Sequence, residues 1–164
     1  MAHLEYLIIH CTATPEGREV TANEIYRWHT NPKDKGGRGW SKPGYSEMIH
    51  LDGTIEELVP YNDDHWVDNW EVSFGAKGMN YKSRHIVYVG GCDKNMKPKD
   101  TRTDAQKEAL EMYVKSHTTL QPQWRIAAHY HFSRKACPSF DVEQWLKEIN
   151  VKQKNIYTKN PTVL

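Results

Sequence analysis

The sequence predicts a single α/β domain in which helices pack on a central mixed β-sheet. Apolar runs of strand length end near residues 10 and 89, two capping-box motifs open helical patterns, and an Asp-Gly pair joins two further strand-like segments. Because strands and helices alternate along the chain, a mixed sheet covered by helices explains their order. The 164 residues suffice for one domain with its own hydrophobic core.

The first strand and the first helix are predicted near the N-terminus. Residues 4–10 are almost continuously apolar and include two isoleucines, which is typical of a buried strand. Thr21 and Glu24 form a capping box, so we expect a short helix that runs to about His29. Residues 31–43 are rich in glycine, lysine and proline and are predicted to form a loop.

A β-hairpin and then a central strand are predicted in the middle of the chain. Residues 45–51 and 54–58 have strand-like patterns, and the Asp52-Gly53 pair between them tolerates the positive φ of a tight hairpin turn. Residues 62–83 show no regular pattern. Residues 86–89 are apolar and largely β-branched, which predicts a central strand.

Two helices and one strand are predicted in the last third of the chain. Thr103 begins a second capping box, residues 125–128 predict a short strand, and Asp141 precedes a helix with apolar positions at helical spacing. Lysine and asparagine dominate after residue 151. We therefore predict a domain over residues 1–151 and a flexible polar tail over residues 152–164.

Composition and charge argue against several classes of function. The chain has 22 basic and 21 acidic residues, whereas a polyanion-binding domain normally has a clear basic excess, so we expect no nucleic-acid partner. Three cysteines are too few, and odd in number, for a disulfide scaffold. The sequence shows neither a membrane-spanning apolar run nor the pattern of a signal peptide. We expect a monomer that is made in the cytoplasm and has no membrane partner.

The segment from residue 127 to residue 141 carries the most reactive side chains. It holds His129, His131, Lys135 and Cys137, and a further imidazole, His10, ends the first strand. Neutral imidazole and thiolate are ligands that Zn²⁺ prefers, and two nitrogens with one sulfur leave one tetrahedral position open. Residue chemistry alone leaves three interpretations: a catalytic zinc site with His10, a structural zinc site with His131, or ordinary hydrogen-bonded histidines and a buried thiol.

Four blocks of residues carry a more specific signal, because their order and spacing agree together. They are Ile8-Ile9-His10-Cys11-Thr12-Ala13-Thr14; Trp28-His29 with Gly44-Tyr45 and Asp52-Gly53-Thr54; Ala76-Lys77-Gly78-Met79-Asn80 with Ser83 and Val89-Gly90-Gly91; and Ala128-His129 with Lys135-Ala136-Cys137-Pro138-Ser139-Phe140-Asp141. In these blocks, and over most of residues 5–150, the sequence resembles the type 2 N-acetylmuramoyl-L-alanine amidases. Among these it most resembles the phage lysozyme-amidases, which share their fold with the peptidoglycan recognition proteins.

The resemblance implies an activity and a set of site residues. It makes His10, His129 and Cys137 the ligands of one Zn²⁺ ion, and Tyr45 and Lys135 the two catalytic side chains. The implied reaction is hydrolysis of the amide bond between N-acetylmuramic acid and L-alanine in peptidoglycan or in muropeptides. The resemblance also implies a phage or prophage lysin that acts on the cell wall after its release from the cytoplasm.

Some positions depart from the family pattern. Ser46 and Glu47 follow Gly44-Tyr45 where relatives have histidine or asparagine and then phenylalanine, and Gly75 stands where many relatives have a histidine. The loop over residues 31–42 is longer than in relatives. We expect these departures to lie in the substrate groove and to affect substrate preference rather than the ligand set.

Two other functions remain open. One is a peptidoglycan-binding module of the same fold that does not cut its ligand, although such members usually lack the thiolate that Cys137 supplies. The other is a cytosolic amidase that recycles muropeptides. His131 falls outside the implied ligand set, and Cys11 and Cys92 are assigned no role.

Overall fold

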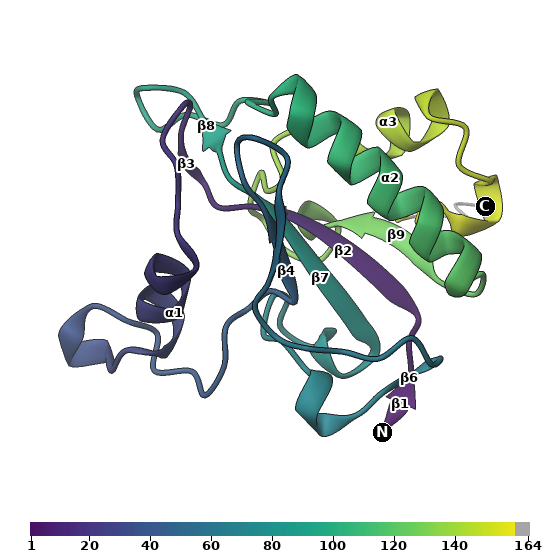
Figure 1. Cartoon of the computed structure of the whole chain (residues 1–164), viewed down its shortest axis with the longest axis horizontal. Helices are drawn as coiled ribbons and strands as arrows, with labels where there is room; N and C mark the ends of the chain where they lie inside the picture. Colours follow the sequence, from purple (N-terminus) through teal and green to yellow (C-terminus); the bar gives the residue numbers. More distant parts are fainter. Residues whose placement is uncertain (160–164) are drawn as a thin grey trace.

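The computed structural model describes residues 1–159, and a five-stranded mixed sheet forms its centre (Figure 1). The strand order is β5-β4-β7-β2-β9, with β2 parallel to β7 and β9, β4 parallel to β7, and β5 antiparallel to β4. The predicted α/β fold with a mixed sheet is therefore confirmed. The strands are β2 (Tyr6–Cys11), β4 (Glu47–Ile49), β5 (Ile55–Glu57), β7 (Ser83–Tyr88) and β9 (Arg125–Ala128).

Three helices cover the two faces of the sheet, with α2 and α3 on one side and α1 on the other (Figure 1). Side chains alternate along each strand. Leu7 and Ile9 of β2 therefore belong to the core beneath α2 and α3, while Met48 of β4 and Val87 of β7 pack against α1. The helices are α1 (Ala22–Thr30), α2 (Asp104–Leu120) and α3 (Val142–Glu148).

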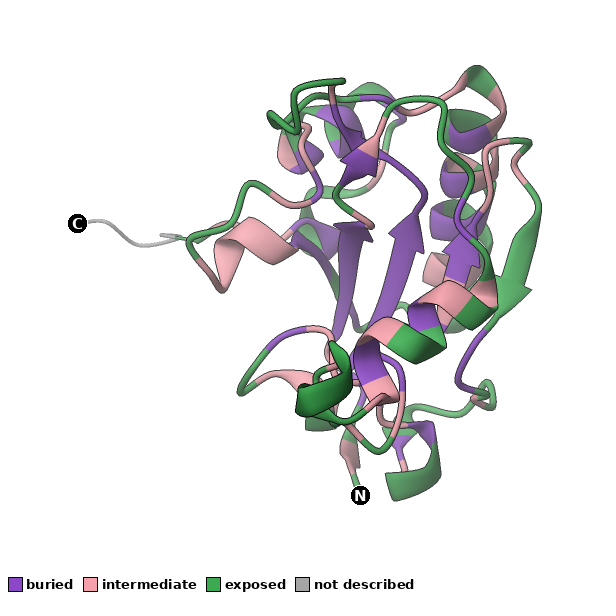
Figure 2. Cartoon of the chain, turned by 90° about the vertical axis from the view of Figure 1, so that its left-hand side faces the viewer, coloured by how far each residue is buried: buried purple, intermediate pink, exposed green. Residues whose placement is uncertain are grey.

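The remaining elements are short and lie around the sheet. Figure 2 shows that the inner strands are buried, whereas the edge strand β5 is exposed. No helix within residues 1–159 has both the length and the apolar character needed to cross a bilayer. The short strand pairs are β1 (Ala2–His3) with β6 (Trp66–Val67) and β3 (Thr14–Pro15) with β8 (Gly91–Cys92), and the 3₁₀ turns are Lys33–Lys35, Asn69–Glu71, Asn80–Lys82, His129–His131 and Gln153–Asn155.

The predicted helix starts are confirmed by their capping hydrogen bonds. Thr21 accepts from the backbone N–H of Glu24, whose carboxylate in turn accepts from the backbone N–H of Thr21. Thr103 and Gln106 form the same reciprocal pair before α2. Asp141 caps α3. Each such cap contributes about 1 kcal/mol to helix stability.

The hairpin and the central strand are present, with boundaries that differ from the prediction. Gly53 has a φ of +88° at the turn, and the paired part of each hairpin strand is shorter than predicted. Strand β7 begins three residues before the predicted start at Ile86, because Ser83, Arg84 and His85 already pair with β2. The polar side chains of these three residues are buried. Local apolar pattern cannot reveal a strand whose buried residues are polar.

The chain beyond residue 151 differs from the expected tail as far as Tyr157. Asn155 is buried, and its side-chain amide donates to the carbonyl oxygens of Pro122 and Trp124. Ile156 is buried beside Ile126 of β9, and Tyr157 packs against the apolar cluster on the opposite face. Packing on the domain therefore continues past residue 151, and the part of the predicted tail from 160 to 164 lies outside the described residues.

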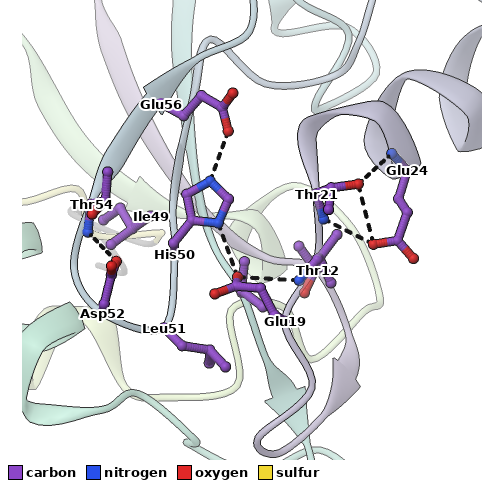
Figure 3. A network of polar contacts seen from close by, with 12 residues as sticks. Thr12, Glu19, Thr21, Glu24, Ile49, His50, Leu51, Asp52, Thr54 and Glu56 are labelled. Carbon is purple, nitrogen blue, oxygen red and sulfur yellow. Dashed lines mark hydrogen bonds and ion pairs between the residues drawn. The ribbon is translucent and has the colours of Figure 1, made fainter.

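A surface histidine ties the hairpin to the segment before α1 (Figure 3). The Nδ1 atom of His50 lies 2.9 Å from Glu19 Oε1, and its Nε2 atom lies 2.8 Å from Glu56 Oε1. Partial burial lowers the pKa of His50, but the two carboxylates outweigh burial, and the net effect raises this pKa above its ordinary value.

Candidate metal centre

Two parallel strands bring His10 and His129 to the same edge of the sheet. β2 and β9 pair with Ile9 opposite Ala128, so His10 and His129 occupy the next position at the carboxyl end of the two strands. Their ring centroids are 4.6 Å apart. This is the edge at which sites form in sheets with parallel strands. The sequence places both histidines at strand ends, but only the strand order makes them neighbours.

Cys137 reaches the same place from the loop between β9 and α3. The backbone N–H of Tyr130 donates to the Cys137 carbonyl oxygen over 2.9 Å, and the Tyr88 hydroxyl donates to the Pro138 carbonyl oxygen over 2.7 Å. The backbone N–H of Cys11 donates to the Cys137 sulfur over 3.2 Å. These contacts hold the loop through its backbone and aim the sulfur at the end of β2.

The ligand atoms of His10, His129 and Cys137 all lie within 4.8 Å of one another. Within residues 1–159 this is the one group of three or more metal-ligating side chains that could hold an ion. His10 is 1% exposed, whereas His129 and Cys137 are half-buried, so solvent reaches the group past the latter two. Two nitrogens and one sulfur suit a tetrahedral cation and leave one position open.

Electrostatics favour the ligating form of both histidines. Burial, with a smaller contribution from the Lys135 ammonium, lowers the pKa of His129 to about 4. Burial and neighbouring imidazoles lower the pKa of His10 well below its ordinary value. Both rings are therefore neutral near pH 7, as metal ligation requires. The Cys11 thiol and burial raise the pKa of Cys137. A bound cation would counter this effect, because a thiol that coordinates a metal ion is deprotonated.

A cavity of about 190 Å³ lies beside this group, and both Tyr45 and Lys135 line it. The ring centroid of Tyr45 is 5.1 Å from that of His10. Burial raises the pKa of Tyr45 well above its ordinary value, so its phenol stays protonated and can donate a hydrogen bond. Lys135 is exposed, and its ammonium lies near enough to depress the pKa of His129.

His29 fixes the turn that carries Tyr45, a role that the sequence alone does not reveal. The backbone N–H of Gly44 donates to His29 Nδ1 over 2.9 Å, and the His29 and Tyr45 rings contact each other with centroids 5.2 Å apart. Burial lowers the pKa of His29 to about 4, so the ring stays neutral and keeps this acceptor nitrogen. The Trp28-His29 block marks this histidine in the sequence, but the block alone assigns it no role.

His131 lies apart from the three-ligand group. Its Nδ1 atom accepts a hydrogen bond from the backbone N–H of Ala128 over 3.0 Å, and its ring contacts Tyr157. The structural zinc site that would use His131 therefore lacks geometric support. Of the side chains that the sequence analysis singles out, the structure groups His10, His129 and Cys137 and excludes His131.

The departures from the family pattern fall in different places. Ser46 is buried, and Glu47 accepts a hydrogen bond from the Tyr61 hydroxyl. Neither residue lines the cavity, so the expectation that both lie in the groove is corrected. Gly75 lies against the ring of His85: a Cβ atom at residue 75 would approach His85 Nδ1 to 2.5 Å. The absence of a side chain at Gly75 makes room for an imidazole from β7.

Known proteins resemble this chain in sequence and in fold. Residues 2–140 match the family described as N-acetylmuramoyl-L-alanine amidase. The endolysin of Enterobacteria phage K11 is 33% identical over 139 residues, which cover 85% of this chain and 83% of that protein. The endolysin of Enterobacteria phage T3 is 32% identical over 144 residues, which cover 88% of this chain and 86% of that protein.

Solved structures of lower identity share the fold. The N-acetylmuramoyl-L-alanine amidase LysC from Clostridium intestinale URNW superposes with a TM-score of 0.70 at 22% identity, over 92% of this chain and 88% of that one. The Drosophila peptidoglycan recognition protein PGRP-LB gives a TM-score of 0.70 at 20% identity, over 99% of this chain and 88% of that one. With the family match over most of its length, the chain belongs to the N-acetylmuramoyl-L-alanine amidase family.

Proposed function

We propose that this peptidoglycan amidase is zinc-dependent, that His10, His129 and Cys137 hold one Zn²⁺ ion, and that the protein serves as a phage or prophage lysin. The observation that carries the proposal is the convergence of these three ligand atoms within 4.8 Å at the edge of the sheet. The donor set fits zinc, because two neutral imidazoles and one thiolate are ligands that this ion prefers. When bound, zinc supplies Lewis acidity and a water nucleophile that is active near neutral pH.

Tyr45 and Lys135 supply what the reaction needs from the protein. Attack of water on the amide carbonyl puts negative charge on the carbonyl oxygen, and fixed donors that face this oxygen stabilise the transition state. The Lys135 ammonium carries a positive charge to the cavity, and the protonated Tyr45 phenol can donate to the same oxygen or position the water. A protonated phenol and an ammonium are poor nucleophiles, so we propose direct attack by water.

Mass spectrometry of digested peptidoglycan tests the reaction. Purified sacculi incubated with the protein should release stem peptides that begin with a free amino group on L-alanine, and a chelator should suppress this product. A parallel sample with the Cys137→Ala variant provides the matched control. Binding of the protein to sacculi with no new amino terminus on L-alanine would favour the non-catalytic binding module instead.

The role as a lysin is supported by the phage endolysins that the chain resembles. A lysin should clear a suspension of intact sacculi, whereas a recycling enzyme should act only on soluble muropeptides. For the lysin role we expect comparable cleavage of intact sacculi and of soluble muropeptides when both contain the same concentration of the amide bond. Cleavage confined to the soluble fragments would support the recycling amidase.

We predict that His131→Ala leaves zinc content and amidase rate close to those of the unchanged protein. The His131 ring engages a backbone N–H and Tyr157 rather than the ligand group, so the substitution costs stability of about 1 kcal/mol from one lost hydrogen bond. Zinc per chain and hydrolysis rate are measured on the same preparation. Loss of the metal together with unfolding would instead favour the structural zinc site.

A further inference from the structure

The two ring nitrogens of His10 have different partners. Nδ1 faces the ligand group and lies 3.8 Å from the Cys137 sulfur. Nε2 points the other way and lies 2.9 Å from Nδ1 of His85. His85 belongs to the neighbouring strand β7, on the same face of the sheet as His10, and is fully buried. The hydrogen-bond partner of His10 on the side away from the ligand group is thus another histidine.

The contacts that lead from His10 Nε2 through His85 to Asn80 allow one assignment of donors and acceptors. The side-chain oxygen of Asn80 accepts from the backbone N–H of Ala76 over 2.9 Å, and the same oxygen lies 2.9 Å from His85 Nε2. Because that oxygen can only accept, His85 Nε2 must carry the proton. A neutral His85 then has a bare Nδ1 that accepts from His10 Nε2, which leaves His10 Nδ1 as the nitrogen with the free lone pair.

The surroundings of His85 restrict the position of its ring. His85 is 0% exposed, and its two ring nitrogens face His10 and Asn80. Gly75 lies against its ring, and a Cβ atom there would come within 2.5 Å of Nδ1 and 2.6 Å of Cγ. The absence of a side chain at residue 75 is therefore a requirement for the position of the His85 imidazole.

We propose that His85, anchored by Asn80, is a positioning residue that fixes the tautomer and the ring orientation of His10 so that Nδ1 is presented to the cation. This inference rests on the proposed zinc site but concerns residues outside the ligand set. Partners of this kind fix the tautomer of a ligating imidazole, and their loss typically weakens metal binding by about 10- to 100-fold. His85 itself belongs neither to the ligand group nor to the residues that line the cavity.

Zinc affinity measured by competition with a chromophoric chelator tests the proposal. We expect His85→Leu to weaken zinc binding about 10- to 100-fold. His85→Asn retains an acceptor oxygen near the position of Nδ1 and should recover most of the affinity. The matched control is His50→Leu, which removes an imidazole that also bridges two partners but lies outside the ligand group. Unchanged zinc affinity in a folded His85→Leu protein would overturn the proposal.

Nitrogen–proton correlation spectra of the histidine rings in the zinc-free protein provide a second readout. The unchanged chain should show His10 protonated at Nε2, and His85→Leu should show a mixture of tautomers. Protonation of His10 at Nδ1 in the unchanged chain would overturn the proposal even if no variant folds. Both measurements are independent of amide cleavage, so failure of the proposed function is seen separately, in the mass spectrometry of digested sacculi.

Discussion

Replacing Cys137 with alanine is expected to abolish amide hydrolysis and to strip zinc from the protein during dialysis. The substitution removes the one sulfur ligand and leaves two imidazoles, which hold the ion weakly. The Lewis acidity of a bound ion supplies several kcal/mol of transition-state stabilisation. Since roughly 4 kcal/mol corresponds to about 10³-fold in rate, a loss of at least this size is expected.

The fold should survive this substitution. The loop around Cys137 is held through the carbonyl oxygens of Cys137 and Pro138, which a change of side chain leaves in place. The three measurements are zinc content, hydrolysis rate and unfolding temperature of the same preparation.

The matched control for Cys137→Ala is Cys92→Ala, which removes a buried thiol outside the ligand group and should keep both zinc and activity. An active Cys137→Ala protein would contradict the proposed ligand set. An inactive Cys92→Ala protein that remains folded would show that removal of a thiol outside the ligand group also abolishes hydrolysis. The loss of activity in Cys137→Ala would then not be specific to the metal ligand.

The elements of the fold could be predicted where the signal is local. The capping boxes at Thr21 and Thr103 are recognisable because a cap is defined by residues three positions apart, and the hairpin turn at Gly53 because positive φ favours glycine. The start of β7 could not be predicted in this way. Its polar residues are buried by partners distant in sequence, such as Tyr61, whose ring lies 3.6 Å from the Arg84 guanidinium.

The candidate site was predictable only in part for the same reason. His10, His129 and Cys137 belong to residue types that bind metals and lie in recognisable blocks, so sequence could single them out. His85 gives no such signal, because a histidine within a strand is chemically informative only once its neighbour is known. The hydrogen bond to His10 joins residues 75 positions apart, and no local pattern encodes it.

Lys135→Ala is expected to lower the amidase turnover number by about 10²- to 10³-fold, the effect of removing one fixed donor from a developing oxyanion. Tyr45→Phe should lower it by a similar factor, since it removes the phenolic donor and leaves the ring that packs beside His10 and His29. Neither side chain belongs to the ligand group, so zinc content should stay near one ion per chain in both variants. Turnover is measured with a soluble muropeptide at saturating concentration.

Two further variants decide whether Lys135 acts through its charge at the cavity. Arg134→Ala is the matched control, because Arg134 is an exposed cation on the same loop that does not line the cavity, and its loss should leave turnover unchanged. Lys135→Arg keeps a cation at the cavity and should recover part of the rate, although a planar guanidinium places its donors differently from an ammonium. Equal losses in Lys135→Ala and Arg134→Ala would mean that the loop contributes only general positive charge. A loss confined to Lys135→Ala, with zinc retained, would place its ammonium at the carbonyl oxygen.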